Sequence, residues 1–234
     1  TTAVGGSGNW TLQNAGAEFT SGSPVIFDDS ADRFTINLTS NVDPSTIVFS
    51  NDNNNYVLGS SGGFGITSGS LIKNGMGRLT IGTNNTYTGT TAVNDGVVEV
   101  TGSIATSSTI TVGPNGELVF NPASASVYPN VLAGSGIFKK QGSSALTLSG
   151  ANTFTGDFRL EGGMLNLDSA GALGGAPGIL TITGGILDNT SGAAVTMTGN
   201  KPQAWNADVT FTGSNSLNMG TGAVTLGGED ATRT

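Results

Sequence analysis

The sequence predicts an all-β protein that folds as a right-handed parallel β-helix, or β-solenoid. Short alternations of apolar and polar residues recur along the whole chain, and no window of helical length shows a period of 3.6 residues. Gly accounts for 38 of the 234 residues and charged residues for only 10%, which suits many short strands joined by tight turns. A stretch rich in Thr, Asn and Gly occurs twice, and such repetition indicates stacked repeating units.

We expect strands wherever apolar residues alternate or run together between Gly, Asn, Asp, Ser and Pro. The nearest approach to a helix is SAGALGG, residues 169–175, which has room for one helical turn. In chain order, the expected strands are residues 10–12, 25–27, 34–38, 47–49, 56–58, 71–72, 79–81, 97–100, 110–112, 118–120, 131–132, 137–138, 146–148, 158–160, 164–167, 180–182, 186–187, 195–197, 209–211, 217–219 and 224–226.

The repeat favours a solenoid over a sandwich. Asn85 aligns with Asn152 and Tyr87 with Phe154, and this offset divides into three turns of roughly 22 residues. An immunoglobulin-like sandwich has short strands too but needs no recurring turn in register. We therefore expect about ten coils, with Asn85 and Asn152 at equivalent corners three coils apart and both side chains pointing along the stack.

The chain divides into two predicted parts. Residues 1–70 are expected to form N-terminal solenoid coils or a capping segment, and residues 71–234 a β-helix that carries the repeats at 71–100 and 137–167. Trp10 is expected to cover the first coil. Tyr87 and Phe154 are interpreted as stacked core or corner residues rather than ligand contacts.

Composition argues against several classes of function. The formal charge of −8 disfavours nucleic acid and anionic membrane surfaces as partners. The chain has no run of about 18 apolar residues, so we expect no membrane insertion of this segment. Cys and His are both absent, which removes disulfides, thiolate metal sites and the commonest general base. We therefore expect no catalytic residues, no cofactor and no resident metal.

The densest acidic cluster is FDDSADRF, residues 27–34, with Asp28, Asp29 and Asp32. Three carboxylates on one turn are suitable oxygen ligands for Ca²⁺. However, their spacing matches neither the EF-hand loop nor the nonapeptide calcium repeat. We prefer a solvated Asp-rich turn and leave calcium binding open.

A polysaccharide-degrading β-helix enzyme is the sharpest alternative, since such enzymes place acidic and basic residues on one face. Asp157, Arg159 and Glu161 share one face of a strand, whereas the first copy of the repeat has Thr90, Ala92 and Asn94 there. We interpret this row as an exposed charge ladder, with weak ligand binding left open. The basic residues are scattered along the sequence; they are Arg33, Lys73, Arg78, Lys139, Lys140, Arg159, Lys201 and Arg233.

Residues 71–100, LIKNGMGRLTIGTNNTYTGTTAVNDGVVEV, and residues 137–167 resemble the autotransporter-associated β-strand repeat, also called the passenger-associated transport repeat. Lys73, Gly75 and Gly77 match its Lys-x-Gly-x-Gly start, and residues 150–156 match its central part. The resemblance implies a β-helical passenger exported across a Gram-negative outer membrane. The chain opens with polar residues and shows no secretory signal, so we expect either that a signal has been removed or that the chain is a piece of a longer protein. The resemblance implies a C-terminal β-barrel translocator, which the sequence lacks, and we therefore expect an internal segment.

These observations lead us to expect a non-catalytic structural or adhesive segment of an extracellular protein, either attached to the bacterial outer membrane or secreted. Its partners would be neighbouring coils of the same long protein or another copy of itself, stacked end to end into fibres. The alternative is a module that binds polysaccharide or surface glycans. An enzyme that degrades polysaccharide is less favoured.

Overall fold

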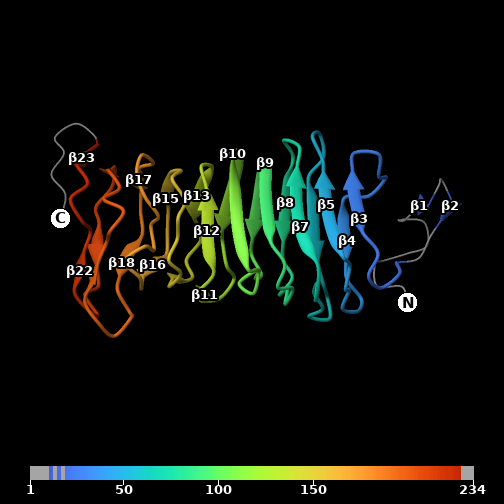
Figure 1. The fold of residues 1–234 in the computed structure, drawn as a ribbon, viewed down its shortest axis with the longest axis horizontal. Helices are drawn as coiled ribbons and strands as arrows, with labels where there is room; N and C mark the ends of the chain where they lie inside the picture. The colour runs from blue at the N-terminus through green and yellow to red at the C-terminus, as the bar shows by residue number, and fades with distance from the viewer. Residues whose placement is uncertain (1–10, 13–14, 17–18, 228–234) are drawn as a thin grey trace.

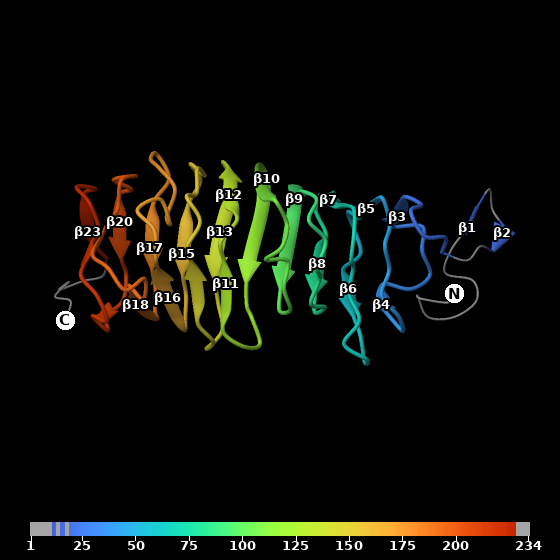
Figure 2. The same cartoon turned by 60° about the horizontal axis from the view of Figure 1, so that its bottom comes forward.

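The computed structural model describes residues 11–12, 15–16 and 19–227. The chain winds into a parallel β-solenoid of about nine turns, and its coils follow one another along the long axis (Figure 1). The same succession from β3 to β23 is visible when the molecule is turned (Figure 2). The predicted fold class is therefore confirmed, with about one coil fewer than expected.

Helix is absent from the described residues. The segment 169–175 forms a turn instead, in which the Ala172 amide donates to the Ser169 carbonyl. Within the described ranges, no helical segment has the length and hydrophobicity needed to cross a membrane.

Three faces run along the solenoid, each built from parallel strands in register. Face 1 contains β3 (Val25–Asp28), β5 (Thr46–Ser50), β7 (Ser70–Asn74), the first parts of β9 (Thr91–Val100) and β10 (Thr109–Phe120), and β12 (Val131–Gly134). Face 2 contains β4 (Thr35–Asn37), β6 (Tyr56–Gly59), β8 (Arg78–Ile81), the second parts of β9 and β10, β13 (Ile137–Lys140), β15 (Phe158–Leu160), β17 (Leu180–Ile182), β20 (Gln203–Trp205) and β23 (Val224–Leu226).

Face 3 is built from shorter strands. It contains β11 (Ser126–Tyr128), β14 (Leu146–Leu148), β16 (Met164–Leu167), β18 (Ile186–Asp188) and β21 (Thr210–Phe211). Two small pairs lie outside the three faces: β19 (Val195–Thr196) is parallel to β22 (Leu217–Asn218), and β1 (Thr11–Leu12) is antiparallel to β2 (Ala15–Gly16). Because β9 and β10 each run across faces 1 and 2, these two faces form one 14-stranded sheet.

Most expected strands are present, and two of the missed strands share a cause. The prediction omitted β2, β11, β20 and the first part of β9. The sequences SVY of β11 and QAW of β20 carry little apolar alternation. Both extend a ladder by pairing with a neighbouring coil, β11 with β14 and β20 with β17. Backbone hydrogen bonds to the neighbouring coil thus form these strands although their sequences lack a clear hydrophobic pattern. The ladder also crosses residue 70 through the β5–β7 pair, and the division at that residue stays a prediction.

The core consists of inward-facing side chains that stack from coil to coil. On face 2, Leu79, Val98, Leu118 and Phe138 are partners on successive strands, and all four are fully buried. Tyr87 and Phe154 are also buried, which confirms that they are core residues. Each large apolar side chain removed from water in this way contributes about 1.5–3 kcal/mol.

The two copies of the repeat lie on different faces. Leu71, Thr91, Ile110 and Leu132 form one stack on face 1, and the coils between them differ slightly in length. Three coils beyond Leu71, this stack reaches Leu132. Phe138, which occupies the position of Leu71 in the second repeat, belongs to face 2 instead. The repeat period is three turns plus one step to the next face. The interpretation of the offset as a whole number of turns was therefore wrong.

Asn85 and Asn152 nevertheless make the same hydrogen bonds. Each Oδ1 accepts an amide from the preceding coil, from Ile66 at 2.9 Å and from Leu132 at 2.8 Å respectively. Each Nδ2 donates to a carbonyl of the following coil, that of Ser103 at 3.0 Å or Ala172 at 2.7 Å. The side chains point along the stack as predicted. The two corners are not the same corner, because the second repeat is rotated by one face.

This rotation can be measured with spin labels on cysteine variants, since the native chain has no Cys. Labels at Ile72 and Ala133 lie on one outward row three coils apart. We therefore expect their separation to be about 14 Å plus the label arms. Labels at Ala92 and Arg159 occupy the same repeat position but different faces, so we expect a clearly longer distance by double electron–electron resonance. Equal distances for both pairs would contradict the rotation.

Candidate functional site

Two buried lysines form the most unusual polar feature of the solenoid. Lys73 in β7 and Lys140 in β13 are fully buried, and both occupy inward positions of their strands. The stem of Lys73 stacks between Phe49 and Val93, and the stem of Lys140 has Phe120 as its partner on the preceding coil. Charged side chains are almost never fully buried unless their charge is compensated. The compensation must therefore lie at the ammonium groups.

The compensation comes from main-chain carbonyls at the corner that follows each strand. Lys73 Nζ donates to the carbonyls of Asn74 at 2.7 Å and Gly75 at 2.5 Å. Lys140 Nζ donates to Gln141, Gly142 and, one coil later, Gly162, at 2.5, 3.0 and 3.3 Å. Carbonyl oxygens thus replace part of the hydration shell that each ammonium group loses on folding.

Glycine on the next coil is required at each of these corners. Gly96 has a φ of 68° and Gly163 a φ of 67°, values that side chains with a Cβ rarely adopt. A Cβ at Gly163 would also collide with the Gly142 carbonyl and the Lys140 ammonium group, and one at Gly96 would collide with the Gly75 carbonyl. We call this arrangement of Lys, corner carbonyls and next-coil Gly the lysine corner.

Lys201 is a third buried lysine, and different groups compensate its charge. It is 4% exposed, and its Nζ donates to the carbonyls of Gly156 and Gly175, both at 2.8 Å. Its ammonium group also lies 5.0 Å from the centre of the Phe154 ring, within the range of a cation–π contact. Burial lowers the pKa of Lys73, Lys140 and Lys201 to about 8 in each case.

In the acidic turn, the carboxylates of Asp28 and Asp29 accept hydrogen bonds from the chain itself. Asp28 Oδ1 accepts from the amide of Ser30, and Asp32 is exposed. Asp29 reaches the following coil, where its carboxylate accepts backbone amides of Asp52, Asn53 and Asn54. The amide of Asp52 makes the largest contribution to a lowered pKa of Asp29. Among the described residues, no group of three or more His, Cys, Asp or Glu side chains could hold a metal ion.

Asp29 is one of several side chains whose oxygen accepts a backbone amide from the next coil. Burial acts to raise the pKa of Asp188, but its hydrogen bonds, chiefly from Ser214, lower it overall. These coil-to-coil bonds tie polar corners together where the strands are interrupted. The other members of the set are Asn37, Asn41, Asp52, Asn55, Asp157, Asp168 and Asn200.

The outward charges gather on face 2. Arg78 pairs with Glu99 at 3.0 Å and Lys139 with Glu117 at 2.9 Å, each between neighbouring coils. The predicted row is present but loosely joined: Arg159 and Asp157 are 3.9 Å apart, and Glu161 accepts from Gln141 at 2.7 Å.

The basic residues therefore fall into spatial groups. Arg78, Lys139 and Arg159 lie on face 2, and the three lysines of the preceding paragraphs are buried. Arg33 is exposed in the acidic turn, and Arg233 lies outside the described residues. The description of the basic residues as scattered holds for the sequence but not for the structure.

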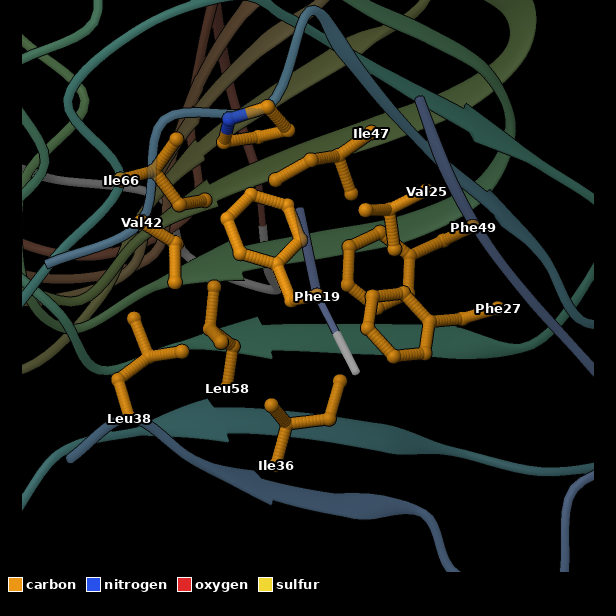
Figure 3. Close-up of a pocket in the computed structure, with 11 residues that line it drawn as sticks. Phe19, Val25, Phe27, Ile36, Leu38, Val42, Ile47, Phe49, Leu58 and Ile66 are labelled. Atoms are coloured by element: carbon orange, nitrogen blue, oxygen red, sulfur yellow. The ribbon is translucent and has the colours of Figure 1, made fainter. Parts of the chain in front are cut away.

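Phe19 fills the N-terminal end of the core. Its ring projects into a small apolar cavity whose lining comes from the first coils (Figure 3). The prediction assigned this role to Trp10, which lies outside the described residues. Trp205, the second tryptophan, is partly buried, and its Nε1 donates to Gln203 at 3.1 Å.

Comparison with known proteins bears on this geometry. The passenger-associated transport repeat matches residues 71–100 and 138–167, the two segments that contain the lysine corners. These two segments are similar to the passenger-associated transport repeat and make up about a quarter of the chain. The chain is also 34% identical over 126 residues to the Adhesin BmaC autotransporter of Brucella suis biovar 1. That alignment covers 51% of this chain and 4% of the adhesin. No solved structure matches the chain.

The geometry gives a physical reason for the Lys and Gly positions of the transport repeat. Lys73 and Lys140 provide the buried ammonium groups, Gly75 and Gly142 provide carbonyls, and the glycine of the following coil leaves space. Sequence reasoning missed this site because it described the basic residues only as scattered and used Lys73 only as a match to the start of the repeat. The signal was present in the strand alternation, since Lys73 is in phase with Leu71 and Lys140 with Phe138.

Replacement of Gly163 tests the lysine corner of the second transport repeat. We expect Gly163→Ala to lower the free energy of unfolding by about 1–3 kcal/mol, because a Cβ there strains the backbone and displaces the Lys140 ammonium group. Gly59→Ala is the matched control, since a Cβ at Gly59 meets nothing within 4 Å. Denaturant unfolding of both variants measures the difference. A loss at Gly163 no larger than that at Gly59 would contradict the proposed geometry.

The lowered lysine pKa values predict a stability that rises with pH. The three lysines titrate near pH 8 in the folded chain and near 10.4 when unfolded. Above about pH 8 the folded chain releases these protons first, so the free energy of unfolding should increase up to about pH 9.5. The raised pKa of Tyr56, about 12, acts in the opposite direction above pH 10 and sets the upper limit of the measurement.

Denaturant midpoints between about pH 7.5 and 9.5 measure this effect. Lys140→Met keeps an unbranched apolar stem but removes one titrating group, so the rise should shrink by about a third. A wild-type chain whose stability is flat or falls over this interval would show that the ammonium groups are fully compensated.

Proposed function

We propose that the chain is a non-catalytic, surface-exposed passenger segment of an exported bacterial protein, in which the solenoid serves as an adhesin stalk. The observation that carries this proposal is the position of the repeat's distinguishing side chains. Lys73, Lys140, Asn85 and Asn152 are buried. Lys73 binds carbonyls of its own corner, while Lys140, Asn85 and Asn152 also bind neighbouring coils. Residues engaged in this way maintain a scaffold and are not available to a substrate. The similarity to an autotransporter adhesin supports the same class of protein.

Export to the surface is tested with the full-length protein in its own bacterium. Antibodies raised against residues 19–227 should label intact cells or the secreted fraction, and protease added to intact cells should remove the signal. Labelling that requires permeabilised cells would overturn the proposed location. Retention on washed cells against release into the medium separates an attached protein from a secreted one.

The non-catalytic part of the proposal is tested on the purified chain. Incubation with pectin, alginate, cellulose or mucin glycans should release no new reducing ends or unsaturated products. Depolymerisation that is abolished by Asp157→Asn or Arg159→Gln, but not by Thr181→Gln on the same face, would establish an enzyme instead.

A second role, stacking of copies end to end, is favoured by the last described coil. Phe211, Val224 and Leu226 continue inward stacks whose preceding members, such as Leu187 and Ile182, are buried. These three are 46%, 49% and 42% exposed. Exposed inward side chains and strand edges can be covered by a further coil of the same protein or by an identical chain.

Sedimentation velocity over a range of concentrations tests this stacking. The wild-type chain should associate progressively, and the double variant Val224→Lys and Leu226→Lys should remain monomeric because charge is placed on the inward row. Thr225→Lys, which alters the outward residue between them, should associate like the wild type. A wild-type chain that is monomeric at all concentrations, or an equal effect of all three substitutions, would reject stacking.

A further inference from the structure

Face 1 presents an outward row that differs from the rest of the surface. Its members are paired on six successive strands: Ile26, Val48, Ile72, Ala92, Thr111 and Ala133. Five of the six are aliphatic and none is charged. Ile26 is 66% exposed and Thr111 is exposed, while the other four are partly exposed. A continuous apolar row on an exposed sheet marks a contact surface more often than scattered apolar residues do.

The residues beside this row are polar but uncharged over its central part. On one side Ser70 and Thr90 are linked, with the Thr90 amide 3.1 Å from Ser70 Oγ. On the other side Asn94 Nδ2 donates to Asn74 Oδ1 at 2.8 Å. Asp28 is the charged residue at the N-terminal end of this flank, and it lies opposite Ser50 in the β3–β5 ladder. Face 1 thus combines an apolar centre with hydroxyl and amide borders, whereas the ion pairs occupy face 2.

The size of this surface restricts what can occupy it. Six strands about 4.8 Å apart and three outward residues across give a strip of roughly 300–400 Å². A stable protein–protein interface buries about 800 Å² on each partner, so a second copy or another folded protein would gain too little here. A slender, extended ligand needs only the width of the strip. The scarcity of charge, in a chain with a net charge of −8, disfavours an ionic ligand.

We propose that face 1 is a binding strip for an extended, uncharged polysaccharide that lies along the row from β3 to β12. The aliphatic side chains would contact the C–H surfaces of the sugar rings, and the Ser, Thr and Asn borders would exchange hydrogen bonds with hydroxyl groups. This proposal rests on the proposed role as a surface-exposed segment and adds a ligand class to it. Each strand contributes little, so affinity should increase with the number of sugars until the strip is filled.

The test uses titration of the ¹⁵N-labelled chain with cello-, chito- and manno-oligosaccharides of two to eight sugars. At least one series should shift amide signals of β5, β7 and β9, with a dissociation constant that falls at least tenfold from the shortest to the longest member. Raising NaCl from about 0.05 to 0.5 M should change that constant by less than twofold, because no ion pair forms. Polygalacturonate, an acidic polymer, should bind at least tenfold more weakly.

Variants locate the binding. Ile72→Glu at the centre of the row and Thr111→Glu at an exposed position should each weaken binding at least tenfold. Val127→Glu on face 3, where Val127 is 55% exposed, is the matched control and should bind like the wild type. Thr111→Glu keeps the test informative if Ile72→Glu unfolds the chain.

Several outcomes would overturn the strip without affecting the proposed role of the whole segment. These are no binding to any neutral series, preferential binding to polygalacturonate, or binding that survives both substitutions on face 1. Self-association that is abolished by Ile72→Glu would assign the face to a second copy instead. Failure of surface labelling, with glycan binding intact, would reject the cellular role but leave the strip in place.

Discussion

Successive coils of this protein meet at the spacing of hydrogen-bonded parallel strands, about 4.8 Å, and the corners must hold the same spacing without a regular ladder. Gly96 and Gly163 leave room for the carbonyls of the preceding coil, while Asn85 and Asn152 replace backbone groups where the strands stop. The lysine corner adds an ammonium group that donates to two or three main-chain carbonyls. These glycines, asparagines and lysines all help to provide hydrogen-bond partners for polar backbone groups that are buried between coils.

Many charged side chains on the surface also bind groups of a neighbouring coil. Asp29 and Asp188 carry negative charge in a chain with few charges, but their carboxylates are directed at amides of the following coil. The ion pairs of face 2 also join neighbouring coils. Much of the formal charge therefore contributes to cohesion between coils, and face 1 has almost no charge along its central row. The surface differs from face to face although the core is continuous.

The fold could be predicted from the sequence because period-two alternation and a long internal repeat are both consequences of stacking. The lysine corners were missed because a charged residue is normally assigned to the surface, and only its phase with Leu71 or Phe138 shows otherwise. The strands β11 and β20 depend on pairing partners that lie a full coil away in the sequence. The acidic turn was identified as a candidate site, but which groups meet Asp29 depends on the loop of the next coil.

The one-face rotation between the repeats has a consequence for changes in length. If the segment between two equivalent points were excised, for example residues 85–151, Asn152 would take the place of Asn85 and strand β15 would take the place of the first part of β9. Strand β15 could pair with β7 in the register of β9, because Leu71–Thr91 and Phe138–Phe158 are equivalent pairs in the two repeats. All coils beyond the junction would, however, turn by one third of a revolution relative to those before it. Gain or loss of repeats could thus redirect the outward surfaces of a long rod while its interior stays the same.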